Sequence, residues 1–254
     1  MLRSLRSPRV DGDPWREGGT TRGDSGAGLL PFADRTAAGE ALAARLCLMP
    51  VAREAPLVLA LPRGGVPVAA AVARALRAPL DLLLVRKIGA PSQPELAVAA
   101  LVDGVQPEVV IDPAMCERFG ADDAYLAAKA RLAIEENERR RALYLAGRQA
   151  WSLAGRSVIV VDDGIATGTT MRAALQALRR QRPKRLLVAV PVASREAAAR
   201  LRGEADEWLC LAEPVPFEAV GRHYRHFEQV GDEEVLQALE AAAAEHADSS
   251  VPPA

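Results

Sequence analysis

The chain has 254 residues, 50% of them hydrophobic, and its 32 basic and 33 acidic side chains leave a formal net charge of −1 at pH 7. This length suffices for one large hydrophobic core, and the balanced charge argues against nucleic acid as a partner. The three cysteines, Cys47, Cys116 and Cys210, form no CxxC pair, which predicts reduced thiols in a cytoplasmic protein. Every apolar run is too short to cross a membrane, so no membrane association is expected.

The two ends of the chain have the composition of segments without stable structure. Residues 1–30 contain six glycines and no apolar period, and we expect a disordered tail there. Residues 247–254 read ADSSVPPA and are expected to be frayed. The domain is therefore predicted to occupy residues 31–246.

Strand and helix patterns alternate from residue 32 onward. Apolar runs predict strands at 55–62, 79–87, 95–104, 108–112, 156–163, 184–192 and 205–212. Helical spacing predicts helices at 34–48, 66–76, 121–147, 169–181, 194–203 and 232–246, the first with Asp34 as its N-cap. The main strands are continuously apolar, which indicates an α/β fold with a parallel sheet covered by helices on both faces. Ligands in such sheets bind beyond the carboxyl ends of the strands.

The most informative stretch, residues 158–175, reads VIVVDDGIATGTTMRAAL. Backbone N–H groups of a Gly/Thr loop at a helix N-terminus form an anion site. Asp162 and Asp163, just before that loop, suit two neighbouring hydroxyls such as those of a ribose. The stretch therefore predicts a sugar-phosphate site. The alternative is a strand-to-helix turn with aspartate caps.

Two further motifs follow predicted strands. In LPRGGVPVA, residues 61–69, Gly64 and Gly65 allow the backbone to approach a bulky anion, and Arg63 adds positive charge. In VRKIGAP, residues 85–91, Arg86 and Lys87 end the strand predicted at 79–87. If the strands are parallel neighbours, all three motifs meet at one edge of the sheet.

Together these motifs resemble the type I phosphoribosyltransferases, and especially one bacterial subfamily of predicted phosphoribosyltransferases. The resemblance covers roughly residues 32–240 and is carried by FADRTAAGEALAARL, ALPRGGVPVA, VRKIGAPSQPELAVAAL, VDDGIATGTTMRAAL, VPVAS and FEAVGRHYRHFEQVGDEEV. In relatives the domain can be joined to a hydrolase, but these 254 residues contain no Gly-x-Ser-x-Gly motif. The resemblance implies a small hood region beside the sheet, and a homodimer is a candidate assembly.

The resemblance also implies a reaction and a set of site residues. The reaction is the Mg²⁺-dependent transfer of a 5-phosphoribosyl group from phosphoribosyl pyrophosphate (PRPP) to a nitrogen acceptor, with release of pyrophosphate. Asp162, Asp163 and Lys87 are the catalytic candidates, with Arg86 as the alternative to Lys87. The PRPP-binding candidates are Arg63, Gly64, Gly65, Arg86, Gly164, Ala166, Thr167, Gly168, Thr169 and Thr170. Mg²⁺ is expected to be held mainly by PRPP itself, with Asp162 and Asp163 as its candidate protein ligands. A non-proline cis peptide bond is expected between Leu61 and Gly65, at Arg63–Gly64.

Two positions depart from the subfamily pattern. His223 stands where Trp is usual, and Leu145 follows Tyr144 where Arg is usual. His223 and Tyr224 are candidates for contact with the acceptor, and ordinary aromatic packing is the alternative. The run EENERRR within 121–147 spaces Glu135 with Arg139 and Glu136 with Arg140 at i,i+4. It is either a solvated, salt-paired helix face or a lid whose arginines reach the pyrophosphate.

Two other functions are compatible with a PRPP motif. A PRPP-sensing regulator would bind the same ligand without catalysis, and such proteins usually carry a DNA-binding module or a basic face. A PRPP synthetase would need an ATP-binding region, and none is visible in the sequence.

Overall fold

The computed structural model describes residues 30–94, 96–103, 107–146 and 151–249. Of the tail expected over residues 1–30, residues 1–29 lie outside this range, and so do residues 250–254 of the end expected over residues 247–254. The last helix, α7 (Asp232–Ser249), continues three residues past its predicted end at residue 246. Among the described residues, no helix combines the length and the hydropathy that crossing a bilayer requires.

Five parallel strands form the central sheet, in the order β2-β1-β6-β7-β8. These strands are β1 (Leu57–Ala60), β2 (Leu80–Leu82), β6 (Ser157–Val161), β7 (Arg185–Val192) and β8 (Glu207–Ala212). Each pairs in parallel with its neighbour. The strands β1 and β6 are adjacent in the sheet although about 100 residues separate them, so their following loops meet at one edge.

Helices cover both faces of this sheet. On one face lie α1 (Arg35–Leu46), α2 (Gly65–Leu76) and α7, and on the other lie α5 (Thr169–Arg180) and α6 (Arg195–Leu201). Successive strand residues point to opposite faces. Val58 and Ala60 therefore pack with the first group of helices, whereas Leu57 and Leu59 pack with the second. The predicted α/β class, with a parallel sheet between two helical layers, is confirmed.

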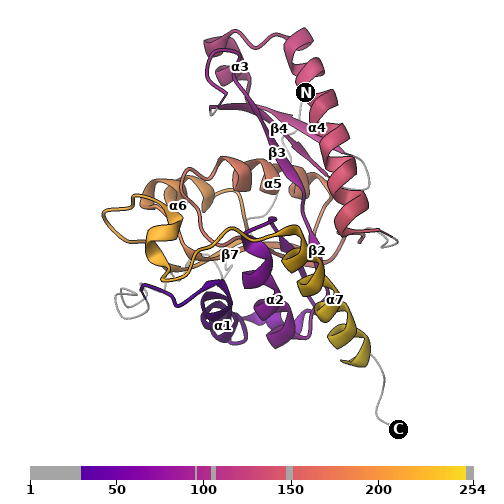
Figure 1. The fold of residues 1–254 in the computed structure, drawn as a ribbon, viewed down its shortest axis with the longest axis vertical. Coiled ribbons are helices and arrows are strands. Elements are labelled where there is room, and N and C mark those ends of the chain that lie inside the picture. Colours follow the sequence, from indigo (N-terminus) through magenta and orange to yellow (C-terminus); the bar gives the residue numbers. More distant parts are fainter. Residues whose placement is uncertain (1–29, 95, 104–106, 147–150, 250–254) are drawn as a thin grey trace, which may run out of the picture.

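A smaller unit is inserted between β2 and β6 and corresponds to the predicted hood (Figure 1). Its antiparallel sheet has the order β3-β4-β5, formed by β3 (Val85–Gly89), β4 (Ala97–Val102) and β5 (Glu108–Ile111). Two helices complete it, α3 (Pro113–Phe119) and the long α4 (Asp123–Tyr144). Ile88, Val98 and Leu126 belong to a hydrophobic cluster within this unit.

The strand predicted at 79–87 is in fact two strands in different sheets. β2 ends at Leu82 and β3 begins at Val85. Between them, the Leu84 carbonyl accepts hydrogen bonds from the Asp103 amide (2.8 Å) and the Asn137 side chain (3.4 Å). The chain thus leaves the parallel sheet at Leu84. Arg86 and Lys87 consequently lie within β3, not at the carboxyl end of a parallel strand.

Candidate active site

The loop after β6 connects the two aspartates to the start of α5. Gly168 has φ +77°, a conformation that favours glycine, and α5 begins at the next residue. The loop is anchored from α6 and its N-cap: the Ala166 carbonyl accepts from the Ser194 hydroxyl (2.6 Å), and the Thr167 carbonyl accepts from Arg200 (3.0 Å). Thr167, Thr169 and Thr170 are exposed. The loop therefore presents three hydroxyls at the N-terminus of a 12-residue helix, an arrangement suited to phosphate.

The two carboxylates have different partners. Asp163 Oδ2 accepts from Arg35 Nε at 2.8 Å, while Asp162 Oδ1 accepts from the Asp163 amide at 2.9 Å. Burial raises the pKa of Asp162 well above its ordinary value, and the negative charge of Asp163 raises it further. Burial also raises the pKa of Asp163, but the Arg35 guanidinium opposes that rise. The pair therefore favours a ligand that donates hydrogen bonds or brings positive charge.

The loop from Leu61 to Gly65 lies directly against these aspartates. A Cβ atom on Gly64 would lie 2.1 Å from Asp163 Oδ2, and one on Gly65 would lie 2.9 Å from Asp162 Cα. Glycine is thus required here by the approach of one loop to the other. The expected non-proline cis bond is present in this loop, but at Pro62–Arg63 and not at Arg63–Gly64.

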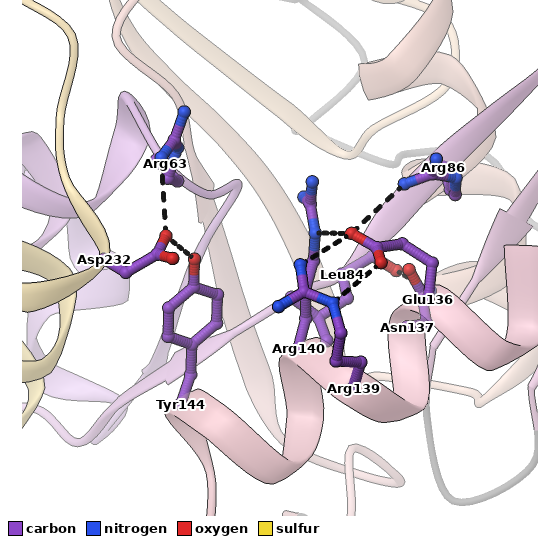
Figure 2. Close-up of polar contacts among 9 residues, drawn as sticks. All are labelled: Arg63, Leu84, Arg86, Glu136, Asn137, Arg139, Arg140, Tyr144 and Asp232. Carbon is purple, nitrogen blue, oxygen red and sulfur yellow. Dashed lines mark hydrogen bonds and ion pairs between the residues drawn. The ribbon is translucent and has the colours of Figure 1, made fainter.

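Arg63 extends from this loop toward α7 and the end of α4 (Figure 2). Its Nη1 lies 3.4 Å from Asp232 Oδ1, the same oxygen that accepts from the Tyr144 hydroxyl at 2.5 Å. The Tyr144 bond lowers the pKa of Asp232. Burial, followed by the bond to Asp232, raises the pKa of Tyr144 to about 12.

Arg86 and Lys87 lie on opposite faces of β3, because side chains alternate along a strand. Arg86 shares a face with Ile88, which packs in the hood cluster, and its Nη1 lies 3.6 Å from Glu136 of α4. Lys87 shares a face with Val85, which packs against the cluster that contains α5. Lys87 is therefore on the α5 side of the strand.

Glu136 holds a group of arginines on α4 (Figure 2). It accepts from Arg139 at 2.9 and 3.0 Å and from Arg140 at 3.0 Å. These guanidinium groups lower the pKa of Glu136 to about 2. The predicted i,i+4 pair between Glu136 and Arg140 is confirmed, whereas Arg139 bonds to Glu136 at i,i+3 and not to Glu135.

Residues 213–230 cover the aspartate loop. Val220 lies 2.5 Å from where a Cβ on Gly164 would be, and the Tyr224 hydroxyl donates to the Asp163 carbonyl at 2.5 Å. Tyr224 is only 6% exposed and packs between Phe32 and Phe227. Tyr224 is therefore a buried residue of this covering segment that supports the aspartate loop through its bond to Asp163.

His223 lies at the edge of the same segment. Its ring centroid is 5.0 Å from that of Phe217, and its Nε2 is buried with no hydrogen-bond partner among the described residues. Burial lowers the pKa of His223, so the ring is neutral at pH 7. A surface cavity of about 380 Å³ is lined by Pro216, Glu218, Arg222 and His223.

Arg35 is the site residue that sequence reasoning missed. It lies 128 positions from Asp163, and an arginine after a helix N-cap is unremarkable in sequence. No local signal indicates the contact. The same holds for Tyr144 and Asp232, whose roles depend on the packing of α4 against α7.

The donors near the loop suit a magnesium ion held mainly by its substrate. Within the described ranges, no group of three or more His, Cys, Asp or Glu side chains could hold a metal. Asp162 and Asp163 provide two neighbouring carboxylates, one of them already paired with Arg35. Mg²⁺ commonly binds one or two carboxylates together with substrate phosphates and water.

Comparison with known proteins identifies the family. The phosphoribosyl transferase domain model matches residues 34–223. Two Mycobacterium tuberculosis proteins whose names describe presumed phosphoribosyl transferases, Rv0571c and MT0597, are each 45% identical over 212 residues, covering 83% of this chain and 47% of theirs. The chain thus spans about half the length of these relatives. The crystal structure of TT1426 from Thermus thermophilus is 43% identical, with a TM-score of 0.71 and coverage of 83% of this chain and 98% of that one. The chain belongs to the phosphoribosyl transferase domain family.

Proposed function

We propose that this domain transfers a 5-phosphoribosyl group from PRPP to a nitrogen acceptor and releases pyrophosphate. The proposal depends mainly on one observation. Two aspartates, an anchored Gly/Thr loop and the Arg63–Gly65 loop come together at one edge of the sheet. In the reaction, the bond from ribose C1 to the pyrophosphate oxygen breaks, and the oxygen keeps the electron pair. The acceptor nitrogen donates its lone pair to C1 and loses its proton.

The proposed roles follow from the positions of the side chains. The loop from Gly164 to Thr170 holds the 5′-phosphate at the start of α5. Between these two ends, the loop residues in this role are Ala166, Thr167, Gly168 and Thr169. Asp162 and Asp163 accept from the ribose 2′- and 3′-hydroxyls. Positive charge develops on C1 as the leaving group departs, and the two carboxylates stabilise that charge. When Mg²⁺ is bound by PRPP and by Asp162 or Asp163, it neutralises charge on the departing pyrophosphate.

Cationic and backbone groups stabilise the leaving group. Gly64 and Gly65 bring backbone close to the aspartates, Arg63 extends from the same loop, and Lys87 lies on the α5 side of β3. Arg86 lies on the face of β3 toward α4, whereas Lys87 lies on the face toward α5, the helix that begins at the Gly/Thr loop; this difference favours Lys87 over Arg86 for the role. The acceptor would lie near residues 213–230, where His223 supplies a neutral ring beside a cavity. Tyr224 would act there through its support of Asp163.

The test is acceptor-dependent release of pyrophosphate from Mg·PRPP, with a panel of nucleobases and related nitrogen heterocycles. Lys87→Ala should lower kcat by more than it raises the KM for PRPP, because leaving-group charge grows toward the transition state. Arg63→Ala should have a smaller effect of the same kind. Lys129→Ala is the matched control, since Lys129 is an exposed residue of α4 with its Nζ 5.6 Å from the centre of the Tyr125 ring, and it should leave kcat within about twofold. Asp162→Asn combined with Asp163→Asn should lose both binding and turnover.

The alternative outcome is a PRPP sensor. Tight Mg·PRPP binding, no pyrophosphate with any acceptor, and a Lys87→Ala effect confined to affinity would contradict the transferase. Binding of a partner protein or DNA that tracks PRPP would then identify a regulator.

A further inference from the structure

Arg35, in the first turn of α1, is fixed by three separate contacts. Its Nε donates to Asp163 Oδ2 at 2.8 Å, with the two side chains 11% and 14% exposed. Its Nη1 donates to the Glu228 carbonyl at 2.8 Å. Its Cζ lies 3.8 Å from the centroid of the Phe227 ring. A guanidinium held in this way has one available orientation toward the carboxylate.

Asp163 is fixed on its other sides as well. Its amide donates to Asp162 Oδ1, its carbonyl accepts from Tyr224, and its Oδ2 lies against Gly64. Because Oδ2 is occupied by Arg35, Oδ1 is the oxygen of Asp163 that a ribose hydroxyl would meet. The two neighbouring aspartates are therefore not equivalent: Asp163 is directly paired with a cation, whereas the described hydrogen bond to Asp162 comes from a backbone amide.

The groups that hold Arg35 belong to the same segment that covers the loop. Phe227 and Glu228 lie in that segment, and it is attached to the residues just before α1. The Phe32 amide donates to the His223 carbonyl (2.9 Å), and the amides of Arg225 and His226 donate to the carbonyls of Phe32 and Ala33 (2.8 and 3.0 Å). The geometry of Asp163 is thus linked, through Arg35, to the folding of residues 213–230 over the site.

We propose that Arg35 is a positioning residue for the ribose carboxylates: it holds Asp163 as an oriented anion and ties that orientation to the covering segment, leaving Asp162 to provide the second contact with ribose. This inference rests on the proposed function. A bridge that only joined α1 to the rest of the fold would change the stability of the protein and leave the Kd of the folded protein for Mg·PRPP unchanged. Stability and Kd, measured separately, therefore distinguish the two roles.

The experiment compares Arg35→Gln and Arg35→Lys with Arg74→Gln. Arg74 is the matched control, since its Nε pairs with Glu245 at 3.2 Å between α2 and α7, away from the loops. The first readout is urea unfolding of the ligand-free protein, which measures how far each bridge stabilises the fold. Arg35→Gln and Arg74→Gln each remove one ion pair, so both should lower the free energy of unfolding. Binding is then measured under conditions in which every variant is folded.

The second readout is the Kd for Mg·PRPP at pH 7.5. Arg35→Gln should raise this Kd by about tenfold, because the Asp163 carboxylate loses the charged hydrogen bond that orients it. Arg35→Lys should restore part of the affinity, since it keeps the charge without the planar guanidinium. Arg74→Gln should keep the wild-type Kd. Wild-type affinity in Arg35→Gln, or an equal loss of affinity in Arg74→Gln, would overturn the inference alone. A wild-type protein that does not bind Mg·PRPP would overturn the proposed function and with it the ribose role of Arg35.

Discussion

Asp162 and Asp163 lie where burial in the folded protein disfavours the charged form of a carboxyl group. Burial raises the pKa of both carboxyl groups, and only Asp163 has a guanidinium that opposes the rise through a direct bond. A native pKa above the unfolded value means that the folded state binds more protons in the interval between the two. Stability therefore decreases as the pH rises through that interval. Such a cost is expected where a site is built for a ligand and not for the empty protein.

Asp162→Asn should consequently raise the melting temperature of the ligand-free protein at pH 7. The substitution is isosteric, and its side-chain oxygen can still accept from the Asp163 amide. The difference from wild type should shrink as the pH falls below the raised pKa of Asp162, since the wild-type carboxyl is then neutral. Asp163→Asn is the contrasting variant: it also removes the direct charge pair with Arg35, so it should raise the melting temperature by less than Asp162→Asn does. Thermal unfolding at pH 5 and pH 7 measures both, and a less stable Asp162→Asn protein at pH 7 would contradict the argument.

At the residue scale, sequence reasoning reaches furthest where chemistry is local. Asp162, Asp163 and the Gly/Thr loop are consecutive, so their types and spacing alone predict a sugar-phosphate site, which stays a prediction. The sequence predicts Gly64 for the approach of an anion, and the structure shows that the nearest anionic group is the carboxylate of Asp163. Arg35 could not be predicted, because its contact depends on how α1 and residues 213–230 pack around the loop.

At the element scale, the errors arose where hydrogen-bond partners change within one apolar run. The sequence is apolar without a break from Leu82 at the end of β2 to Val85 at the start of β3. Periodicity therefore does not reveal that β2 pairs in parallel with β1 while β3 pairs antiparallel with β4. α3 was missed although its signals are present: Asp112 caps it, Pro113 begins it and Gly120 ends it at φ 66°. Only seven residues long, it has too few turns for an apolar period.

The end of α4 is joined to α7 by the bond from Tyr144 to Asp232, which also contacts Arg63. Tyr144→Phe should destabilise the protein by about 1–2 kcal/mol, because Tyr144 is 4% exposed and its hydroxyl donates to a carboxylate. The pKa of Asp232 is lowered in the folded state, so this contribution is present above the ordinary aspartate pKa and is lost as the pH falls through the folded value. The difference between variant and wild type should therefore shrink in acid.

Tyr125→Phe is the matched control for this measurement. The Tyr125 hydroxyl donates to the neutral carbonyl of Gly89 at 2.8 Å within the hood, so its effect should not change between pH 3 and pH 7. Urea unfolding across that range follows both variants. An equal pH dependence for the Tyr144→Phe and Tyr125→Phe variants would show that the strength of the Tyr144 hydrogen bond does not depend on the charge of Asp232.

At the scale of the whole molecule, the proposed PRPP site lies between two units that the chain connects at Leu84 and again between α4 and β6. In this proposal the parallel sheet supplies the aspartates, the Gly/Thr loop and Arg63, and the hood supplies Lys87, with the arginines of α4 as further candidates for contact with the pyrophosphate. The units also touch where Ala100 and Val102 of β4 pack in the cluster that contains α5. A ligand bound by both units would favour one arrangement of the two and oppose unfolding of either.

Mg·PRPP should therefore raise the melting temperature of the whole domain. At a ligand concentration one hundred times Kd, mass action contributes about 2.7 kcal/mol, which corresponds to roughly 5–11 °C for a chain of this size. Hydrogen exchange should slow in the Leu61–Gly65 loop and in the last turns of α4, because the ligand spans both units.

Mg·ATP is the control, and protection by Mg·ATP but not by Mg·PRPP would favour a nucleotide enzyme such as a PRPP synthetase. The combined Asp162→Asn and Asp163→Asn variant should lose the Mg·PRPP effect in both units at once. Loss of protection in the parallel-sheet loop, with protection of α4 retained, would show that the hood binds the ligand independently of the aspartates.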